Sequence, residues 1–158
     1  MSAPFSDYLK LLREVGSLLE QLAELAQQKA DAVRQDDLLA LDDVLKQEQA
    51  LGLNLRGLEL RRAKLVPQLG LEGTTLSVLP TKCPPELEEE TYQTVSEVQN
   101  SYRIYRSSSN MVRTTLELNL HQIEKLVTAA GGDPKDVDAG YAPAEVEPPR
   151  SMKTDFRA

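Results

Sequence analysis

The side chains that most often carry out chemistry in proteins are sparse in this sequence. It contains one histidine, His121, and one cysteine, Cys83, and the two lie far apart along the chain. A nucleophile needs a base within hydrogen-bond reach, and neither residue has an evident partner in its sequence neighbourhood. We therefore expect structural roles for both residues and predict no catalytic site.

The charged and glycine-containing motifs do not indicate a metal or phosphate site. Glu86 to Glu90 follow two prolines, where acidic residues match the positive end of a helix dipole, and Asp42-Asp43 suit a solvated helix face. Gly52 and Gly57 lack the Lys-Ser/Thr that completes a phosphate-binding loop. The basic, hydroxyl-rich patch from Arg103 to Ser109 is interpreted as solvated helix surface. The sequence thus predicts no cofactor, no metal and no enzymatic activity.

The overall composition points to a single helical unit. A chain of 158 residues fits one domain. Its net charge of −7 does not attract nucleic acid or an anionic membrane, so neither is expected as a partner. Aromatic residues make up 4% of the chain, tryptophan is absent and leucine recurs, which favours packed helices over β-sheets.

The expected location is the cytoplasm. A lone cysteine cannot form an internal disulfide and fits a reducing compartment. The first residues have neither the basic nor the apolar region of a signal peptide, and no segment approaches the roughly 18 apolar residues of a membrane span. We expect no membrane insertion.

Two stretches of apolar residues recur at alternating steps of three and four, the spacing of helices packed along a seam. The first runs from Tyr8 to Val33 and the second from Leu41 to Leu69, and they are out of phase with each other. Two interpretations fit: one helix of some sixty residues containing a stutter, or a turn near Arg34-Gln35 with Asp36 or Asp37 as N-cap. We favour the turn, because an antiparallel return buries the same leucines within one molecule, whereas a single helix would extend roughly 90 Å.

Prolines and glycines mark the remaining boundaries. Pro67 should end the second helix near Val66, leaving residues 67–84 as a loop in which a short extended piece could lie along the bundle. A third helix follows Pro84-Pro85 and ends at Gly131-Gly132.

These boundaries predict an all-α fold. Residues 1–132 should form an elongated bundle of three long antiparallel helices, at about 5–33, 37–66 and 86–130. Residues 133–158 are rich in proline and glycine and lack periodicity, so we expect a poorly ordered, flexible tail that sustains no core of its own and orders on binding a partner.

A third seam of the same spacing runs from Val95 to Ala130, and polar residues interrupt all three seams. Glu48 and Arg62 stand in the second seam about 21 Å apart along one helix, so they cannot pair with each other. Each must find a partner elsewhere or mark where the seam opens to solvent, because burial of an unpaired charge is costly. Lys29, Ser109 and Asn119 interrupt the other seams. Such residues either set helix register or leave a weakly filled groove for a foreign helix.

A set of residues spread over the helices and the C-terminal end forms a recognisable pattern: Lys29, Leu41, Glu48-Gln49, Leu51, Leu55, Leu58-Glu59, Arg62, Leu65, Leu69-Gly70, Thr75 to Leu79, Asn110, Tyr141 and the ending Arg150 to Ala158. This pattern resembles the FlgN family of flagellar export chaperones. It implies a bacterial, cytosolic, non-enzymatic protein that keeps hook-associated junction proteins competent for export, prevents their premature assembly and delivers them to the flagellar type III export gate.

The resemblance also implies that the end of the third helix and the tail bind the C-terminal helix of the client. The apolar surface at the end of that helix exceeds what a three-helix monomer covers, which supports the same location. The expected partner-binding residues are Val112, Leu116, Asn119, Leu120, Ile123, Leu126, Tyr141 and Phe156. A structural scaffold that homodimerises through its heptad seams is the alternative from a different class.

Overall fold

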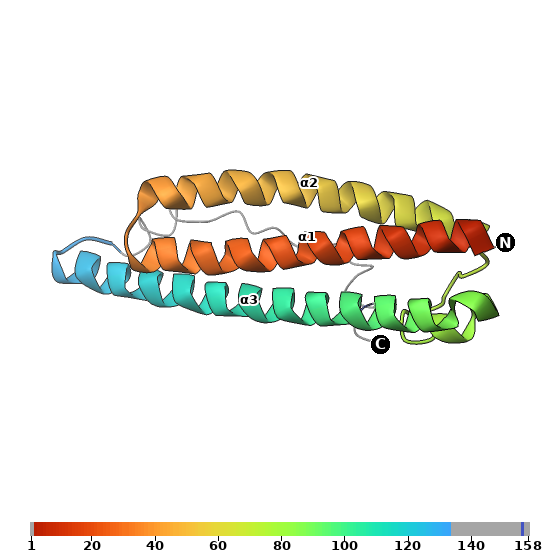
Figure 1. The fold of residues 1–158 in the computed structure, drawn as a ribbon. Coiled ribbons are helices and arrows are strands. Elements are labelled where there is room, and N and C mark those ends of the chain that lie inside the picture. Colours follow the sequence, from red (N-terminus) through yellow and green to blue (C-terminus); the bar gives the residue numbers. More distant parts are fainter. Residues whose placement is uncertain (1, 134–155, 157–158) are drawn as a thin grey trace.

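Three long helices make up most of the described chain, which in this computed structural model comprises residues 2–133 and Phe156 (Figure 1). Helix α1 spans Ser2–Arg34, α2 spans Leu38–Gln68 and α3 spans Glu88–Ala129, with short 3-10 helices at Leu79–Thr81 (η1) and Pro85–Leu87 (η2). No strand occurs within the described residues. The predicted all-α bundle of three long helices is confirmed.

Helix α1 lies between the other two helices. It forms an antiparallel hairpin with α2, and α3 packs alongside α1 and parallel to it (Figure 1). Both α2 and α3 pack extensively on α1, whereas α2 and α3 pack little on each other. This arrangement leaves a side of the bundle, between α2 and α3, that neither helix closes.

The central position of α1 agrees with its sequence pattern. Its seam residues, such as Leu12, Val15 and Leu19, are fully buried. Leu11 and Leu25, which stand one position before the seam, are also buried. A stripe this wide fits a helix that contacts two neighbours rather than one.

The turn between α1 and α2 is confirmed, and the single long helix is wrong. Asp36 adopts a φ of 53°, a left-handed conformation that breaks the helix. The side chain of Asp37 then accepts a hydrogen bond from the backbone N–H of Ala40 at 3.1 Å. This N-cap satisfies one of the free donors at the start of α2.

Helix α2 ends two residues later than predicted, with Pro67 inside its last turn. Proline removes one helical hydrogen bond, but the following residues close the helix end. Gly70, at a φ of 67°, donates to the carbonyl of Pro67, and Leu71 donates to that of Val66. This pattern satisfies the last carbonyls of α2, so one proline at the helix end is tolerated.

The helix starts also differ from the prediction. Helix α1 begins at Ser2, because Pro4 falls in its first turn, where a missing N–H costs nothing. Helix α3 begins at Glu88, because Pro85–Leu87 form the separate η2 turn.

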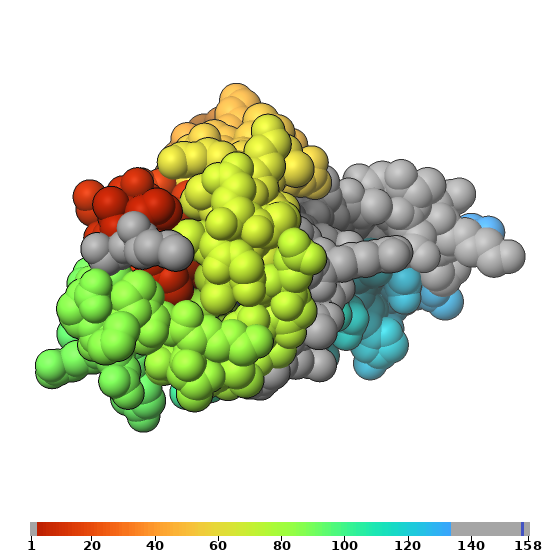
Figure 2. Space-filling view, turned by 90° about the vertical axis from the view of Figure 1, so that its right-hand side faces the viewer, coloured from red at the N-terminus to blue at the C-terminus, as the bar shows by residue number. Residues whose placement is uncertain are grey.

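The loop between α2 and α3 closes one end of the bundle. Leu71, Leu76 and Leu79 are buried and pack into the main core. Figure 2, which looks onto this end, shows the loop (yellow-green) spread beside the start of α1 (red). The extended piece considered for this loop is wrong: the segment from Thr74 to Leu79 forms turns that lead into η1, which brings two of its leucines to the same side.

Phe156 packs into the core of its own chain, whereas it was expected among the residues that bind a partner. Its side chain is 3% exposed and belongs to the main core cluster. A phenyl ring buries a large apolar area at a small cost in side-chain entropy, so a single ring can dock where a polar segment cannot. The other tail residue expected to bind a partner, Tyr141, lies outside the described residues.

Both charged residues in the second seam have partners. Lys29 of α1 reaches Glu48 of α2, with Nζ 2.9 Å from Oε2, and both side chains are almost fully buried. Arg62 forms two hydrogen bonds with Glu59 one turn earlier, at 3.0 and 2.9 Å. The seam therefore does not open to solvent at either position.

Candidate functional site

The contact between α1 and α3 ends at the last turn of α1. A second core cluster joins Ala30 and Val33 of α1 to Val112 and Leu116 of α3. No later residue of α3 belongs to a buried cluster among the described residues.

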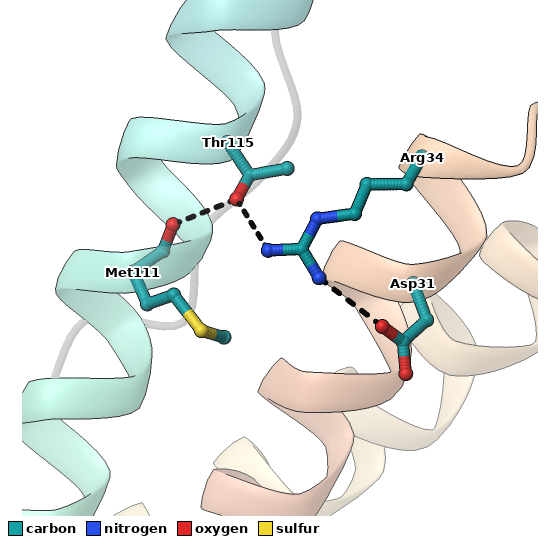
Figure 3. Close-up of polar contacts among 4 residues, drawn as sticks. All are labelled: Asp31, Arg34, Met111 and Thr115. Atoms are coloured by element: carbon teal, nitrogen blue, oxygen red, sulfur yellow. Dashed lines mark hydrogen bonds and ion pairs between the residues drawn. The ribbon is translucent and has the colours of Figure 1, made fainter.

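A polar contact marks the same boundary (Figure 3). Arg34, the last residue of α1, donates from Nη2 to Thr115 Oγ1 at 3.3 Å and from Nη1 to Asp31 at 3.2 Å. The Thr115 hydroxyl in turn donates to the carbonyl oxygen of Met111 at 3.0 Å. This chain of hydrogen bonds fixes α3 against the end of α1.

Helix α3 continues past this point for residues 117–129, which we call the α3 extension. At 1.5 Å per residue, the extension is roughly 20 Å long. Figure 1 shows the end of α3 (blue) reaching beyond the turn that joins α1 and α2. The last turns of the extension thus project past the end of α1.

The extension exposes apolar side chains. Leu126 and Leu118 are 71% and 59% exposed. Leu120, Ile123 and Val127 are half-buried and follow one another at steps of three and four, which places them on one face of the helix. Apolar residues gathered on a helix end form a surface that a partner helix can cover.

The eight residues expected to bind a partner fall into separate places. Val112 and Leu116 are buried against α1, so they anchor α3 and do not face a partner in this conformation. Phe156 is buried against Tyr102, well before the extension along α3. The four residues that lie on the extension are Asn119, Leu120, Ile123 and Leu126.

A second apolar surface was missed by the sequence patterns. Leu53 and Leu60 of α2 are about two-thirds exposed, and Leu53 borders a shallow groove of about 520 Å³ between α1 and α2. Gly57 forms part of this groove, where a Cβ would meet no atom within 4 Å. The two leucines are seven residues apart, which is the heptad spacing, and they lie outside the main seam of α2. This spacing was the signal in the sequence from which the second apolar surface could have been predicted.

The side chains that could take part in catalysis or metal binding do not lie close together. His121 is exposed on the extension, and the Cys83 thiol is half-buried, 3.2 Å from the carbonyl oxygen of Pro80. Within residues 2–133 and Phe156, no group of three or more His, Cys, Asp or Glu side chains is placed to hold a metal ion. In the same part of the chain, none of the helices is both long and apolar enough to cross a membrane.

Comparison with known proteins gives one match. A family model described as FlgN protein matches residues 1–145, which is most of the chain. Comparison with curated proteins and with solved structures returned no match.

Proposed function

Because the chain belongs to the FlgN family of flagellar export chaperones, we propose that it binds the C-terminal helix of a flagellar hook-associated protein through the α3 extension. In this proposal the bound client is kept from assembling early and is delivered to the cytosolic part of the flagellar type III export gate. The chaperone acts in the cytoplasm and performs no catalysis.

The α3 extension is the observation that carries this proposal. It presents Leu120, Ile123 and Leu126 on the part of α3 that follows the last buried cluster of the described residues. An amphipathic client helix places its own apolar residues at the same helical spacing, so the two faces can interlock. Burial of these side chains would stabilise the complex, while the short length of the extension keeps the interface small enough to release the client.

The family and the packing of α1 favour this role over a permanent homodimeric scaffold. A scaffold of the kind considered would pair the heptad seam of one chain with that of another. The α1 seam is already buried within the chain, with Leu12, Val15 and Leu19 fully inaccessible. Pairing of that seam between two molecules would require the bundle to open.

Calorimetry with a synthetic C-terminal helix of a hook-associated protein tests the proposal. We expect the full chain to bind the peptide, and the double variant Ile123→Asp and Leu126→Asp to lose binding, because it places carboxylates in an apolar interface. Leu60→Asp is the matched control, since Leu60 is similarly exposed but lies on α2.

Two outcomes would contradict the proposal. One is that the folded full-length chain does not bind the peptide at ~100 μM, a concentration at which an interface of this size should be occupied. The other is that Leu60→Asp reduces binding as much as the double variant does. Sedimentation of the free chain separates the scaffold, which would run as a stable dimer, from the proposed chaperone.

A further inference from the structure

A pocket on the side of the bundle between α2 and α3 holds the ring of Phe156. The ring meets Tyr102 of α3 edge-on, with centroids 5.3 Å apart and planes at 79°. The guanidinium carbon of Arg62, on α2, lies 5.5 Å from the centroid of the same ring. One side chain from the C-terminal end therefore bridges the two helices that pack little on each other.

The walls of this pocket are held in place without Phe156. Glu59 accepts two hydrogen bonds from Arg62, so the planar guanidinium has a fixed orientation. Tyr8 of α1 also forms a hydrogen bond with Arg62. Burial alone would lower the pKa of Arg62, but the hydrogen bonds and the charge of Glu59 outweigh burial and raise it above its ordinary value. The cation that faces the ring is thus permanent.

This chemistry selects an aromatic side chain. A cation is attracted to the electron-rich face of an aromatic ring, and two rings that meet edge-on place the positive edge of one against the negative face of the other. An aliphatic side chain offers neither interaction. The charges of Arg62 and Glu59 offset each other, so this pair by itself favours neither an acidic nor a basic ligand. An aromatic ring fills the pocket without leaving a buried polar group unpaired.

We propose that the pocket formed by Arg62 and Tyr102 is a docking site for one aromatic side chain, and that Phe156 is its ligand, so that the C-terminal end acts as a reversible latch across α2 and α3. This site is distinct from the α3 extension, and the inference does not depend on the chaperone role.

A ring that belongs to the same chain as its pocket can stay docked with weak, reversible binding. Residues 130–155, 26 in number, separate the end of α3 from Phe156. Tyr102 lies about 40 Å before Ala129 along α3, and 26 residues can extend to about 90 Å, so the segment is long enough. For a flexible chain of this length, the effective concentration is on the order of 1 mM. A single ring with a Kd of about 0.1–1 mM is then docked for about half to nine-tenths of the time and still exchanges.

A tryptophan placed at position 156 reports on the latch, because the natural chain contains none. In the full-length Phe156→Trp variant, we expect blue-shifted emission and several-fold weaker quenching by acrylamide than in the same chain unfolded in urea. Adding Tyr102→Leu should raise the quenching toward the unfolded value. Tyr92→Leu, which changes an exposed tyrosine on the same helix, is the matched control and should leave the quenching unaltered.

A peptide supplied separately tests the pocket without changing its walls. The full-length Phe156→Ala chain, with an empty pocket, should bind the peptide Arg150 to Ala158 with a Kd of about 0.1–1 mM. NMR shift changes should centre on Arg62 and Tyr102, and the same peptide with alanine in place of phenylalanine should cause none.

The latch is wrong if the indole of the Phe156→Trp variant is as accessible to acrylamide in the folded chain as in urea. It is equally wrong if the peptide causes no shift change near Arg62 and Tyr102 at several millimolar, or if the alanine peptide has the same effect. Circular dichroism on each variant shows whether the helices are intact, so that unfolding is not mistaken for undocking.

Discussion

Single residues of this chain show how buried charge is tolerated between helices. Lys29 and Glu48 were visible in the sequence as polar interruptions, but their pairing was not. The two residues lie on different helices, and their distance depends on how α1 and α2 are aligned across the turn. Periodicity gives the face that a residue occupies, but it does not give the residue opposite.

The Lys29–Glu48 pair should be sensitive to the loss of one partner. Glu48→Ala leaves the Lys29 ammonium, with a side chain 3% exposed, buried without its counter-ion. We expect a loss of about 3–5 kcal/mol in the free energy of unfolding, measured in urea. Replacing both residues, Lys29→Met with Glu48→Leu, should recover most of this loss.

A surface pair provides the control for that experiment. Lys46 and Asp42 form an ion pair at 2.9 Å, but both side chains are more than 60% exposed. Lys46→Ala should leave the free energy of unfolding nearly unchanged, because a solvent-exposed ion pair contributes little. Similar losses in Glu48→Ala and Lys46→Ala would show that the Lys29–Glu48 contact is solvated in solution.

Leucines on α2 separate the buried face from the exposed face. Leu55 is 1% exposed and belongs to the core, so Leu55→Ala should cost about 2–5 kcal/mol. Leu60, on the same helix, is 66% exposed, and Leu60→Ala should cost about 0.5 kcal/mol or less. Chemical denaturation measures both, and equal losses would mean that α2 is rotated from the orientation described.

At the scale of the helices, the number of long helices and their order along the chain could be predicted from the sequence. The exact residues at which each helix begins and ends were predicted less well. The phase slip between the two seams located the turn, because a straight helix cannot keep both seams on one side. The extra residues after Pro67 could not be predicted from the proline alone. They depend on Gly70 and Leu71 closing the helix end, which is a property of the following loop.

The cap at Asp37 should contribute measurably to the hairpin. Asp37→Ala removes the acceptor for the Ala40 N–H, and we expect a loss of about 1 kcal/mol in the free energy of unfolding. Asp37→Ser keeps a capping oxygen and should be close to neutral. Equal losses in the two variants would show that the turn depends on backbone conformation rather than on the cap.

At the scale of the whole molecule, the order of helix packing was beyond the sequence. All three helices have seams of similar spacing, so several pairings bury the same residues equally well. The structure places α1 in the centre, and two consequences follow that periodicity does not contain. The end of α3 extends past its neighbour. The loop leucines close one end of the bundle, and Phe156 lies on the side between α2 and α3.

Truncation after Gly132 tests how much the C-terminal end stabilises the bundle. If Phe156 is the residue through which the C-terminal end stabilises the bundle, truncation and the single change Phe156→Ala should lower the free energy of unfolding by the same amount. A latch with an effective concentration on the order of 1 mM and a Kd of about 0.1–1 mM contributes roughly 0.4–1.4 kcal/mol. This is less than the roughly 3–5 kcal/mol of a typical core Phe→Ala change, because the ring can leave without unfolding the helices.

The expected drop in Tm for either variant is about 1–5 °C for a domain of this size, with the helical circular dichroism signal of the bundle retained. Calorimetric melting of the full chain, of the truncated chain and of Phe156→Ala distinguishes the latch from two other cases. A truncated chain much less stable than Phe156→Ala would mean that other residues after Gly132 support the bundle. A loss of several kcal/mol in both variants would mean that Phe156 is a permanent part of the core, since a ring that exchanges freely cannot contribute that much.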